Sequence, residues 1–280
     1  MSDEVACGNA TPAAEIPVVI LCGGMGTRLR EATGESLPKP MVDIGGRPVL
    51  WHIMKTYAHF GHRRFVLCLG YKGDVIKNYF LQYRLQSSDF TLRLSNDGPP
   101  VLHSTDVAED WEVTFVDTGL TTATAGRLHR VGQHLDAERF MLSYGDGVGD
   151  IDLAALLAAH LKAGRLATVT AVRPSSRYGE MDIDLTAGTV RAFREKPTDT
   201  SGWINGGYFV FEREVLTRYL DGDPDVMLET GPLQGLTADA QLSLHCHDGF
   251  WVGMDTYRDW TELNGLWDRG AAPWRVWDET

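Results

Sequence analysis

The chain has 280 residues, enough for one α/β domain with a sizeable buried core, and its hydrophobic content of 43% and charged content of 23% are ordinary for a globular protein. The formal net charge of −12 argues against nucleic acid or an anionic membrane as a partner, so an anionic substrate would have to be held by a few local cations. The sequence contains no apolar run near the ~20 residues of a membrane span and no recognisable signal peptide, which predicts a cytoplasmic protein.

The periodicity of the apolar residues predicts an alternation of strands and helices. Strands are expected at 17–22, 64–69, 90–94, 112–116, 140–143 and 167–172, and helices at 48–60, 74–85, 127–135 and 152–163. This alternation indicates an α/β fold with a Rossmann-like, mixed but mostly parallel central sheet flanked by helices. After residue 173 the expected strands are shorter and are interrupted by glycines, at 181–185, 189–194, 206–211 and 241–246. The second half of the chain is therefore expected to form a smaller, lid-like part.

The domain organisation follows from the same pattern. Residues 1–15 are expected to be a disordered tail, and residues 16–280 a single domain with halves at 16–172 and 173–280. The tryptophans at 51 and between 267 and 277 are expected to anchor the core or an interface between subunits. The cysteines have no metal-binding spacing and are expected to be reduced thiols; they are Cys7, Cys22, Cys68 and Cys246.

A glycine-rich turn follows the first expected strand. The apolar run Val18–Leu21 leads into the sequence GGMGTR at residues 23–28, and Lys39 follows between two prolines. Glycines let backbone N–H groups approach a ligand, so with Arg28 and Lys39 this turn predicts a polyphosphate site, although an ordinary strand-to-helix turn can look alike. A P-loop would need Lys and then Ser or Thr after the last glycine, and a dinucleotide fingerprint would need glycine in place of Leu29, so neither motif fits.

Three further positions carry groups suited to chemistry. Asp146 follows the expected strand 140–143, where ligands of open α/β sheets bind, and its carboxylate suits Mg²⁺, although such an Asp also commonly caps its own turn. Lys196 precedes a proline, which holds it extended so that its ammonium can be aimed, but a solvated pair with Glu195 is the alternative. Asn205 stands before two glycines and can donate and accept hydrogen bonds, or form a plain turn.

Taken together, the motifs resemble those of the sugar-1-phosphate nucleotidyltransferases, and most of all the glucose-1-phosphate cytidylyltransferases. The resemblance extends from residue 17 to about residue 277, and it rests on VILCGGMGTRL, PKPMVDIGGRPVLWHIMK, GYKGDVIKNYF, VDTGLTTATAGRL, YGDGVGDID, EKP, INGGYFVF and FWVGMDTYRD. It implies the nucleotide-diphospho-sugar transferase fold, with a sugar-binding second half. It also implies Mg²⁺-dependent transfer from CTP to a sugar 1-phosphate, foremost α-D-glucose 1-phosphate, with release of pyrophosphate, in a homo-oligomer.

The resemblance also assigns roles to individual residues. It implies that the nucleoside triphosphate is bound by Leu21, Gly23, Gly24, Gly26, Thr27, Arg28, Lys39, Thr118, Gly126 and Arg127. It places the sugar phosphate against Tyr144, Gly179, Glu195, Lys196, Asn205, Gly206 and Tyr208. It assigns catalysis to Arg28, Lys39 and Lys196, and the metal ion to Asp146 and Asp255.

Some positions depart from the pattern of the cytidylyltransferases, and they leave alternatives open. The departures are Leu37, Gly231, Val252, Gly253 and Trp260, most of them in the second half, so the acceptor could be another sugar phosphate or a cyclitol phosphate. The same chemistry with dTTP, UTP, GTP or ATP is a further alternative. A non-catalytic protein that binds nucleotide sugars is disfavoured by the presence of both Asp146 and Asp255, and a Rossmann-type oxidoreductase by the missing third glycine.

Overall fold

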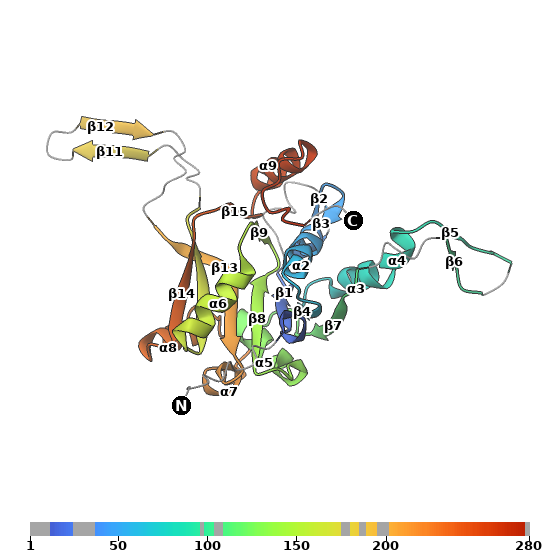
Figure 1. Cartoon of the computed structure of the whole chain (residues 1–280), viewed down its shortest axis with the longest axis horizontal. Coiled ribbons are helices and arrows are strands. Elements are labelled where there is room, and N and C mark those ends of the chain that lie inside the picture. Colours follow the sequence, from blue (N-terminus) through green and yellow to red (C-terminus); the bar gives the residue numbers. More distant parts are fainter. Residues whose placement is uncertain are drawn as a thin grey trace, which may run out of the picture.

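A computed structural model describes residues 12–24, 37–95, 98–103, 109–174, 180–184, 189–194 and 202–277 of the chain. A seven-stranded sheet forms its centre (Figure 1). In spatial order its strands are β14 (Leu242–His247), β10 (Ala167–Val172), β13 (Ile204–Glu212), β8 (Arg139–Tyr144), β1 (Val18–Leu21), β4 (Arg64–Leu69) and β7 (Glu112–Asp117). The predicted α/β fold is confirmed, and the strands predicted at 64–69 and 167–172 match their observed bounds.

One strand of this sheet runs against the others. The neighbours β8, β1, β4 and β7 are parallel, as are β10 and β14, whereas β13 pairs antiparallel with both β8 and β10. The sheet is therefore mixed and mostly parallel, as predicted. Since all the parallel strands end at one edge of the sheet, loops from distant parts of the sequence meet there.

Two layers of helices cover the sheet. One face packs on α2 (Val49–His59), α3 (Gly73–Leu81), α6 (Leu153–Ala163) and α9 (Tyr257–Asp268). The other face packs on α5 (Thr124–Val131), α7 (Val215–Arg218) and α8 (Pro232–Ala238). All four residues of β1 are buried and they point alternately into the two layers, which explains the continuous apolar run. No helix in the described part of the chain has the length and apolarity needed to cross a lipid bilayer.

Among the described residues, four small two-stranded sheets accompany the central sheet. They are β2 (Asp43–Ile44) with β3 (Arg47–Pro48), β5 (Phe90–Thr91) with β6 (Val101–Leu102), β9 (Gly147–Gly149) with β15 (Trp251–Gly253), and β11 (Glu180–Asp184) with β12 (Thr189–Arg194). Two of these hairpins, β5–β6 and β11–β12, extend away from the body of the molecule at opposite ends of Figure 1.

Several predicted boundaries were wrong. The helix predicted at 127–135 begins at Thr124, and its last turn is the 3₁₀ helix η3 (Gly132–His134). The helix predicted at 74–85 is interrupted at Gln82 and continues as α4 (Tyr83–Gln86). The predicted tail reaches too far, because Ala13–Glu15 form the 3₁₀ helix η1 and the next residue, Ile16, is fully buried. Residues 1–11 lie outside the described residues.

The C-terminal tryptophans pack inside the chain around a buried histidine. His52 of α2 is 0% exposed and makes edge contacts with the rings of Trp51, Trp267 and Trp274. Its Nε2 lies 2.9 Å from the Ile44 carbonyl, and Trp274 Nε1 donates to its Nδ1 at 3.4 Å. This arrangement fits only the neutral ring with its proton on Nε2, and burial lowers the pKa of His52 to about 4 despite its backbone hydrogen bonds.

We expect the stability of the fold to fall between pH 6.5 and pH 4 because of His52. The unfolded chain takes up a proton on this ring below about pH 6.5, whereas the folded chain does so only below about pH 4. The shift corresponds to about 3 kcal/mol of unfolding free energy, present above pH 6.5 and lost as the pH falls to about 4. Urea titrations at pH 7 and pH 4.5 measure this difference in the free energy of unfolding.

His52→Gln should weaken this pH dependence, since the amide keeps a donor and an acceptor but does not titrate. His59→Gln is the matched control, because His59 is exposed on the same helix and should leave the dependence unchanged. Equal pH dependence in the wild type and in His52→Gln would contradict the assignment.

Candidate functional site

One lysine and two aspartates meet at the carboxyl edge of the sheet. Lys39 Nζ donates to Asp146 Oδ2 at 2.6 Å and to Asp255 Oδ1 at 2.7 Å. The lysine side chain is only 12% exposed, while those of Asp146 and Asp255 are 35% and 42% exposed. Three residues that are far apart in the sequence therefore form one compact charged group, here called the Lys39–Asp146–Asp255 triad.

A short strand pair places the two aspartates side by side. β9 and β15 are antiparallel, with Gly147 opposite Gly253, and the Met254 N–H donates to the Asp146 carbonyl at 2.8 Å. Asp255 then follows directly, so its carboxylate lies beside that of Asp146.

The start of α9 fixes the second aspartate. The Asp259 carboxylate accepts from the backbone N–H groups of Asp255 and Thr256 at 3.1 and 2.9 Å. In return Thr256 Oγ1 accepts from the Asp259 N–H at 3.2 Å, which completes a capping box. The backbone at Asp255 is thus held from both sides, by β15 and by α9.

The backbone at Lys39 is fixed by its two prolines. Lys39 opens the 3₁₀ helix η2 (Lys39–Met41), with Pro38 as its N-cap and Pro40 in its first turn. Because proline restricts its own φ angle and the conformation of the residue before it, the backbone at Lys39 is set locally. Burial alone lowers the pKa of Lys39, but the charges and hydrogen bonds of Asp146 and Asp255 raise it above the usual value, so the ammonium is charged.

The donor set of this triad fits a divalent cation. Two carboxylates already converge on one positive group at hydrogen-bonding distance, so they can share a cation. Carboxylate oxygens are the ligands that Mg²⁺ prefers, and Mg²⁺ usually takes only one or two carboxylates and completes its octahedral shell with water and substrate phosphates. Asp146 and Asp255 are the residues that would hold such an ion.

A buried arginine joins the ends of three neighbouring strands at the same edge. Arg127, on α5, is 6% exposed. Its guanidinium donates to the Leu69 carbonyl at 3.1 Å, to Thr118 Oγ1 at 2.8 Å and, more weakly, to the Gly23 carbonyl at 3.5 Å. These acceptors follow or end β4, β7 and β1. Burial lowers the pKa of Arg127.

The first glycine of the glycine-rich turn lies directly on this guanidinium. A Cβ atom at Gly23 would approach Arg127 Cζ to within 2.1 Å, so no other residue fits without moving the arginine. Leu21 precedes Gly23 by two positions and Gly24 follows it, and Thr118 is fully buried. The structure thus brings together Leu21, Gly23, Gly24, Thr118 and Arg127.

Gly126 lies in a helix rather than in the expected loop, because α5 begins earlier than predicted. A Cβ atom at this position would lie 2.9 Å from Pro224 Cα, so the glycine allows α5 to pack closely on the loop before α8. This close packing explains why a glycine occupies position 126, without the predicted contact between its backbone and a ligand.

On the other side of the aspartates, a chain of polar contacts surrounds Tyr144. Its hydroxyl donates a short hydrogen bond to Glu229 Oε1 and accepts from Asn205 Nδ2 at 3.1 Å. Thr124, at the start of α5, donates to Glu229 Oε2 at 3.3 Å. Burial and the hydrogen bond to Glu229 raise the pKa of Tyr144, so the phenol keeps its proton. Sequence reasoning gave no role to Glu229, which lies 85 residues from its partner.

The remaining predicted residues divide into two groups. Tyr208 is buried and donates to the Gly147 carbonyl at 3.1 Å, while the Gly206 carbonyl accepts from Trp251 Nε1 at 2.8 Å, so both tie β13 to the β9–β15 pair. The second group lies outside the described residues, and it comprises Gly26, Thr27, Arg28, Gly179, Glu195 and Lys196.

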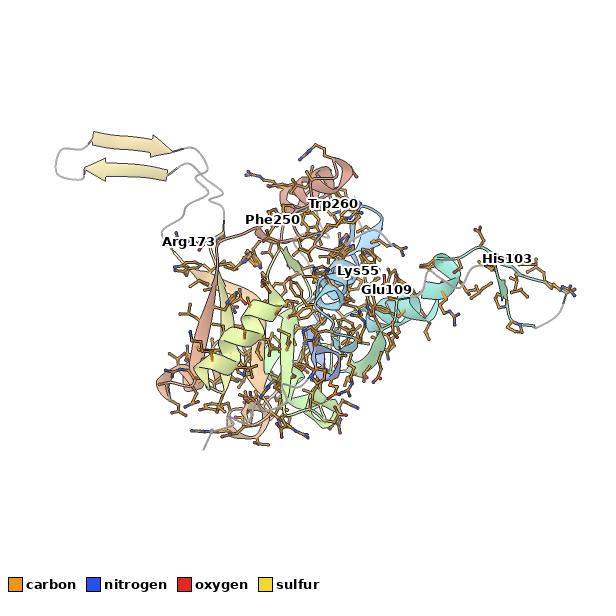
Figure 2. All side chains as sticks on the ribbon, viewed as in Figure 1. Lys55, His103, Glu109, Arg173, Phe250 and Trp260 are labelled. Atoms are coloured by element: carbon orange, nitrogen blue, oxygen red, sulfur yellow. The ribbon has the colours of Figure 1, made fainter. Side chains whose placement is uncertain are left out.

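Some departures from the family pattern have structural explanations. Leu37 packs against the core beside α2. Trp260, labelled in Figure 2, donates from Nε1 to the Asp43 carbonyl at 2.8 Å and so fastens α9 to β2. A Cβ atom at Gly231 would come within 2.5 Å of Val226, so this position requires glycine in the observed backbone.

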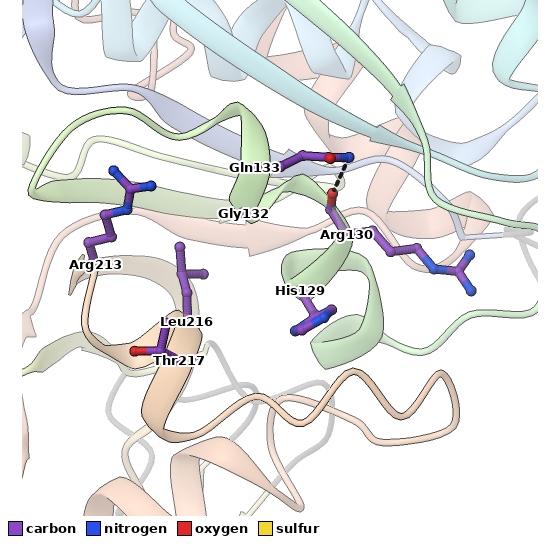
Figure 3. Close-up of a pocket in the computed structure, with 7 residues that line it drawn as sticks. All are labelled: His129, Arg130, Gly132, Gln133, Arg213, Leu216 and Thr217. Carbon is purple, nitrogen blue, oxygen red and sulfur yellow. Dashed lines mark hydrogen bonds between the residues drawn. The ribbon is translucent and has the colours of Figure 1, made fainter.

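A hollow elsewhere on the molecule does not belong to this site. Its volume is about 390 Å³. It lies where α5 ends, and Figure 3 shows its lining residues, which are His129, Arg130, Gly132, Gln133, Arg213, Leu216 and Thr217. None of these lining residues is one of the residues predicted for the site.

Comparisons with known proteins find relatives that match most of this chain. The sequence profile of the family described as nucleotidyl transferase matches residues 17–253. The chain is 47% identical to a glucose-1-phosphate cytidylyltransferase of Salmonella typhi, covering 93% of this chain and 99% of that protein. It is 42% identical to a probable glucose-1-phosphate cytidylyltransferase of Bacillus subtilis, covering 92% and 99%. In fold it is similar to the crystal structure of HddC from Yersinia pseudotuberculosis, with a TM-score of 0.63, 23% identity and coverage of 90% and 99%.

We expect Arg127→Met to destabilise the fold by about 2 kcal/mol, because it removes the buried hydrogen bonds that this guanidinium donates at the ends of β1, β4 and β7. Urea unfolding measures this loss. Arg130→Met is the control, since Arg130 is exposed, lies on the same helix and makes one such hydrogen bond, to the Thr118 carbonyl at 2.6 Å. If both variants were equally stable, Arg127 would not be the link between the three strand ends.

Proposed function

Because the chain belongs to the nucleotidyl transferase family, we propose that it transfers a cytidylyl group from CTP to a sugar 1-phosphate, foremost α-D-glucose 1-phosphate. The products are a CDP-sugar and pyrophosphate. A cytoplasmic location, expected from the sequence, is part of the same proposal.

The observation that carries this proposal is the Lys39–Asp146–Asp255 triad. Its carboxylates and its ammonium lie together at the sheet edge where the glycine-rich turn also begins. Identity of 47% and 42% to cytidylyltransferases over nearly the whole chain supports CTP and glucose 1-phosphate as the substrates.

The reaction needs positioning and charge stabilisation more than acid–base groups. A phosphate oxygen of the sugar 1-phosphate attacks the α-phosphorus of CTP, and the bond to the pyrophosphate oxygen breaks. The attacking oxygen is already anionic, so no general base is required. Negative charge on the triphosphate is the main obstacle, and fixed cations in a partly buried site lower it. Lys39 supplies such a cation, and Arg28 and Lys196 are proposed for the same role.

Residues around the triad hold the reacting groups in place. Arg127 connects the ends of β1, β4 and β7, and Asn205 donates to Tyr144. We propose that the nucleotide binds at the first group and the sugar at the second. Asp146 and Asp255 would hold Mg²⁺, which when bound offsets charge on the phosphate groups.

Pyrophosphate release, measured with Mg²⁺, glucose 1-phosphate and each of CTP, dTTP, UTP, ATP and GTP, tests the proposal. We expect release with CTP alone. Release with another nucleotide would contradict the assignment of the base, and release with none of the nucleotides but with another sugar or cyclitol phosphate would contradict the acceptor.

In the same assay, Asp146→Asn and Asp255→Asn should each lower the rate about a hundredfold or more, because charge stabilisation is lost. Asp136→Asn is the control, since Asp136 is exposed and pairs with Arg64 away from the triad. Near-normal rates for either triad variant at saturating Mg²⁺ would contradict the metal assignment.

We also propose that the chain is a homo-oligomer that associates through the β5–β6 hairpin and its flanks. Large apolar side chains are exposed there, with Leu94 91% and Val101 62% exposed. Such a hairpin with two-residue strands is marginally stable alone and gains from a partner surface. Sedimentation should show an oligomer for the wild type and smaller species for Leu94→Glu, whereas a monomeric wild type would contradict this.

A further inference from the structure

We propose that Lys39 is the resident counter-ion of Asp146 and Asp255, so that a divalent cation binds these carboxylates only by displacing the ammonium. We further infer that the nucleoside triphosphate promotes the exchange by giving Lys39 another anionic partner. This inference rests on the proposed function, since it concerns how the metal ion and the nucleotide enter that same site.

The geometry of the triad carries the first step. The ammonium lies 2.6 Å from Asp146 Oδ2 and 2.7 Å from Asp255 Oδ1, so it already uses one oxygen of each carboxylate. A divalent cation that bound the remaining oxygens would lie beside an ammonium in a partly buried site, where repulsion between like charges is weakly screened. Binding of the ion and retention of Lys39 are therefore mutually unfavourable.

The way in which the three residues are held indicates that the Lys39 side chain moves rather than the two aspartates. The aspartates are held by the β9–β15 pair and by the capping box of α9, and the Lys39 backbone is held by Pro38 and Pro40. The four-carbon side chain of Lys39 has more rotatable bonds than either aspartate side chain, so it is the group best able to move. The lysine side chain is the least exposed of the three, so an ion from solvent meets the carboxylates first.

The nucleotide favours the exchange of Lys39 for a divalent cation in two ways. Two carboxylates do not complete the octahedral shell of Mg²⁺, and phosphate oxygens commonly supply further ligands. The phosphates also carry negative charge that can receive the displaced ammonium. Because coupling between two ligands is reciprocal, the nucleotide should strengthen metal binding by the same factor as the metal strengthens nucleotide binding.

Mn²⁺ binding to the protein, followed by electron paramagnetic resonance without turnover, tests the displacement. If Lys39 leaves the carboxylates free about a tenth of the time, its removal should tighten Mn²⁺ binding about tenfold. We therefore expect Lys39→Met to bind Mn²⁺ about tenfold more tightly than the wild type. The non-hydrolysable α,β-methylene analogue of CTP should tighten binding strongly in the wild type and less in the variant.

Lys55→Met is the matched control. The Lys55 side chain is 13% exposed, similar to that of Lys39, and it pairs with Glu109 at 3.0 Å. Both Lys55 and Glu109 are labelled in Figure 2. This variant also removes one buried positive charge, but its Mn²⁺ affinity should equal that of the wild type. Equal affinity for Lys39→Met and the wild type would overturn the proposal, as would an equal gain for Lys55→Met.

A second measurement uses the unaltered protein and does not depend on how a variant folds. Acetic anhydride modifies free lysine amines, and mass spectrometry reports each site. Saturating Mn²⁺ alone should increase modification of Lys39, and the CTP analogue with Mn²⁺ should suppress it again, while the Lys55 peptide stays constant. Unchanged modification of Lys39 on metal binding would overturn the proposal. Neither measurement requires pyrophosphate release, so a failed assay of activity would refute only the proposed function.

Discussion

The attraction between one ammonium and two carboxylates is the interaction on which the rest of the site depends. Lys39 is separated from Asp146 by 107 positions and from Asp255 by 216 positions, so only the completed fold brings the three charges together. Each of the three stands on backbone that is fixed by local devices, namely two prolines, a short antiparallel pair and a capping box. A partly buried charge is costly unless it is paired, and here each member of the triad satisfies the others.

The central sheet places this triad beside the other functional groups. Its parallel strands end at one edge, where Arg127 joins three of them through hydrogen bonds to backbone and hydroxyl oxygens. The antiparallel strand β13 enters the same region from the opposite direction and contributes Asn205. The two groups of residues that we propose for the nucleotide and for the sugar are therefore built from separate sets of strands, and Tyr144 with Glu229 connects them through Thr124 on α5.

Much of the fold could be predicted from the sequence, because strands such as Arg64–Leu69 carry continuous apolar runs and helices such as α6 carry a clear N-cap at Asp152. The convergence of Lys39, Asp146 and Asp255 could be expected only through family resemblance, since spacing alone does not bring distant carboxylates together. The β9–β15 pair escaped prediction because three-residue strands rich in glycine have no periodicity to detect. The role of Glu229 was not predicted, because its partner Tyr144 is distant in the sequence. The early start of α5 was not predicted, because its first residues are small and are typical of a loop.

The β9–β15 pair has a consequence for how the protein is made. The ribosome delivers the glycine-rich turn and Asp146 well before Trp251–Gly253 and the tryptophans that enclose His52. Long-range contacts of this kind form late, because the intervening chain must first be ordered. A nascent or shortened chain can thus build most of the sheet and still lack the second carboxylate. If Asp255 holds the metal ion as proposed, the chain becomes competent for catalysis only once its last segment has docked.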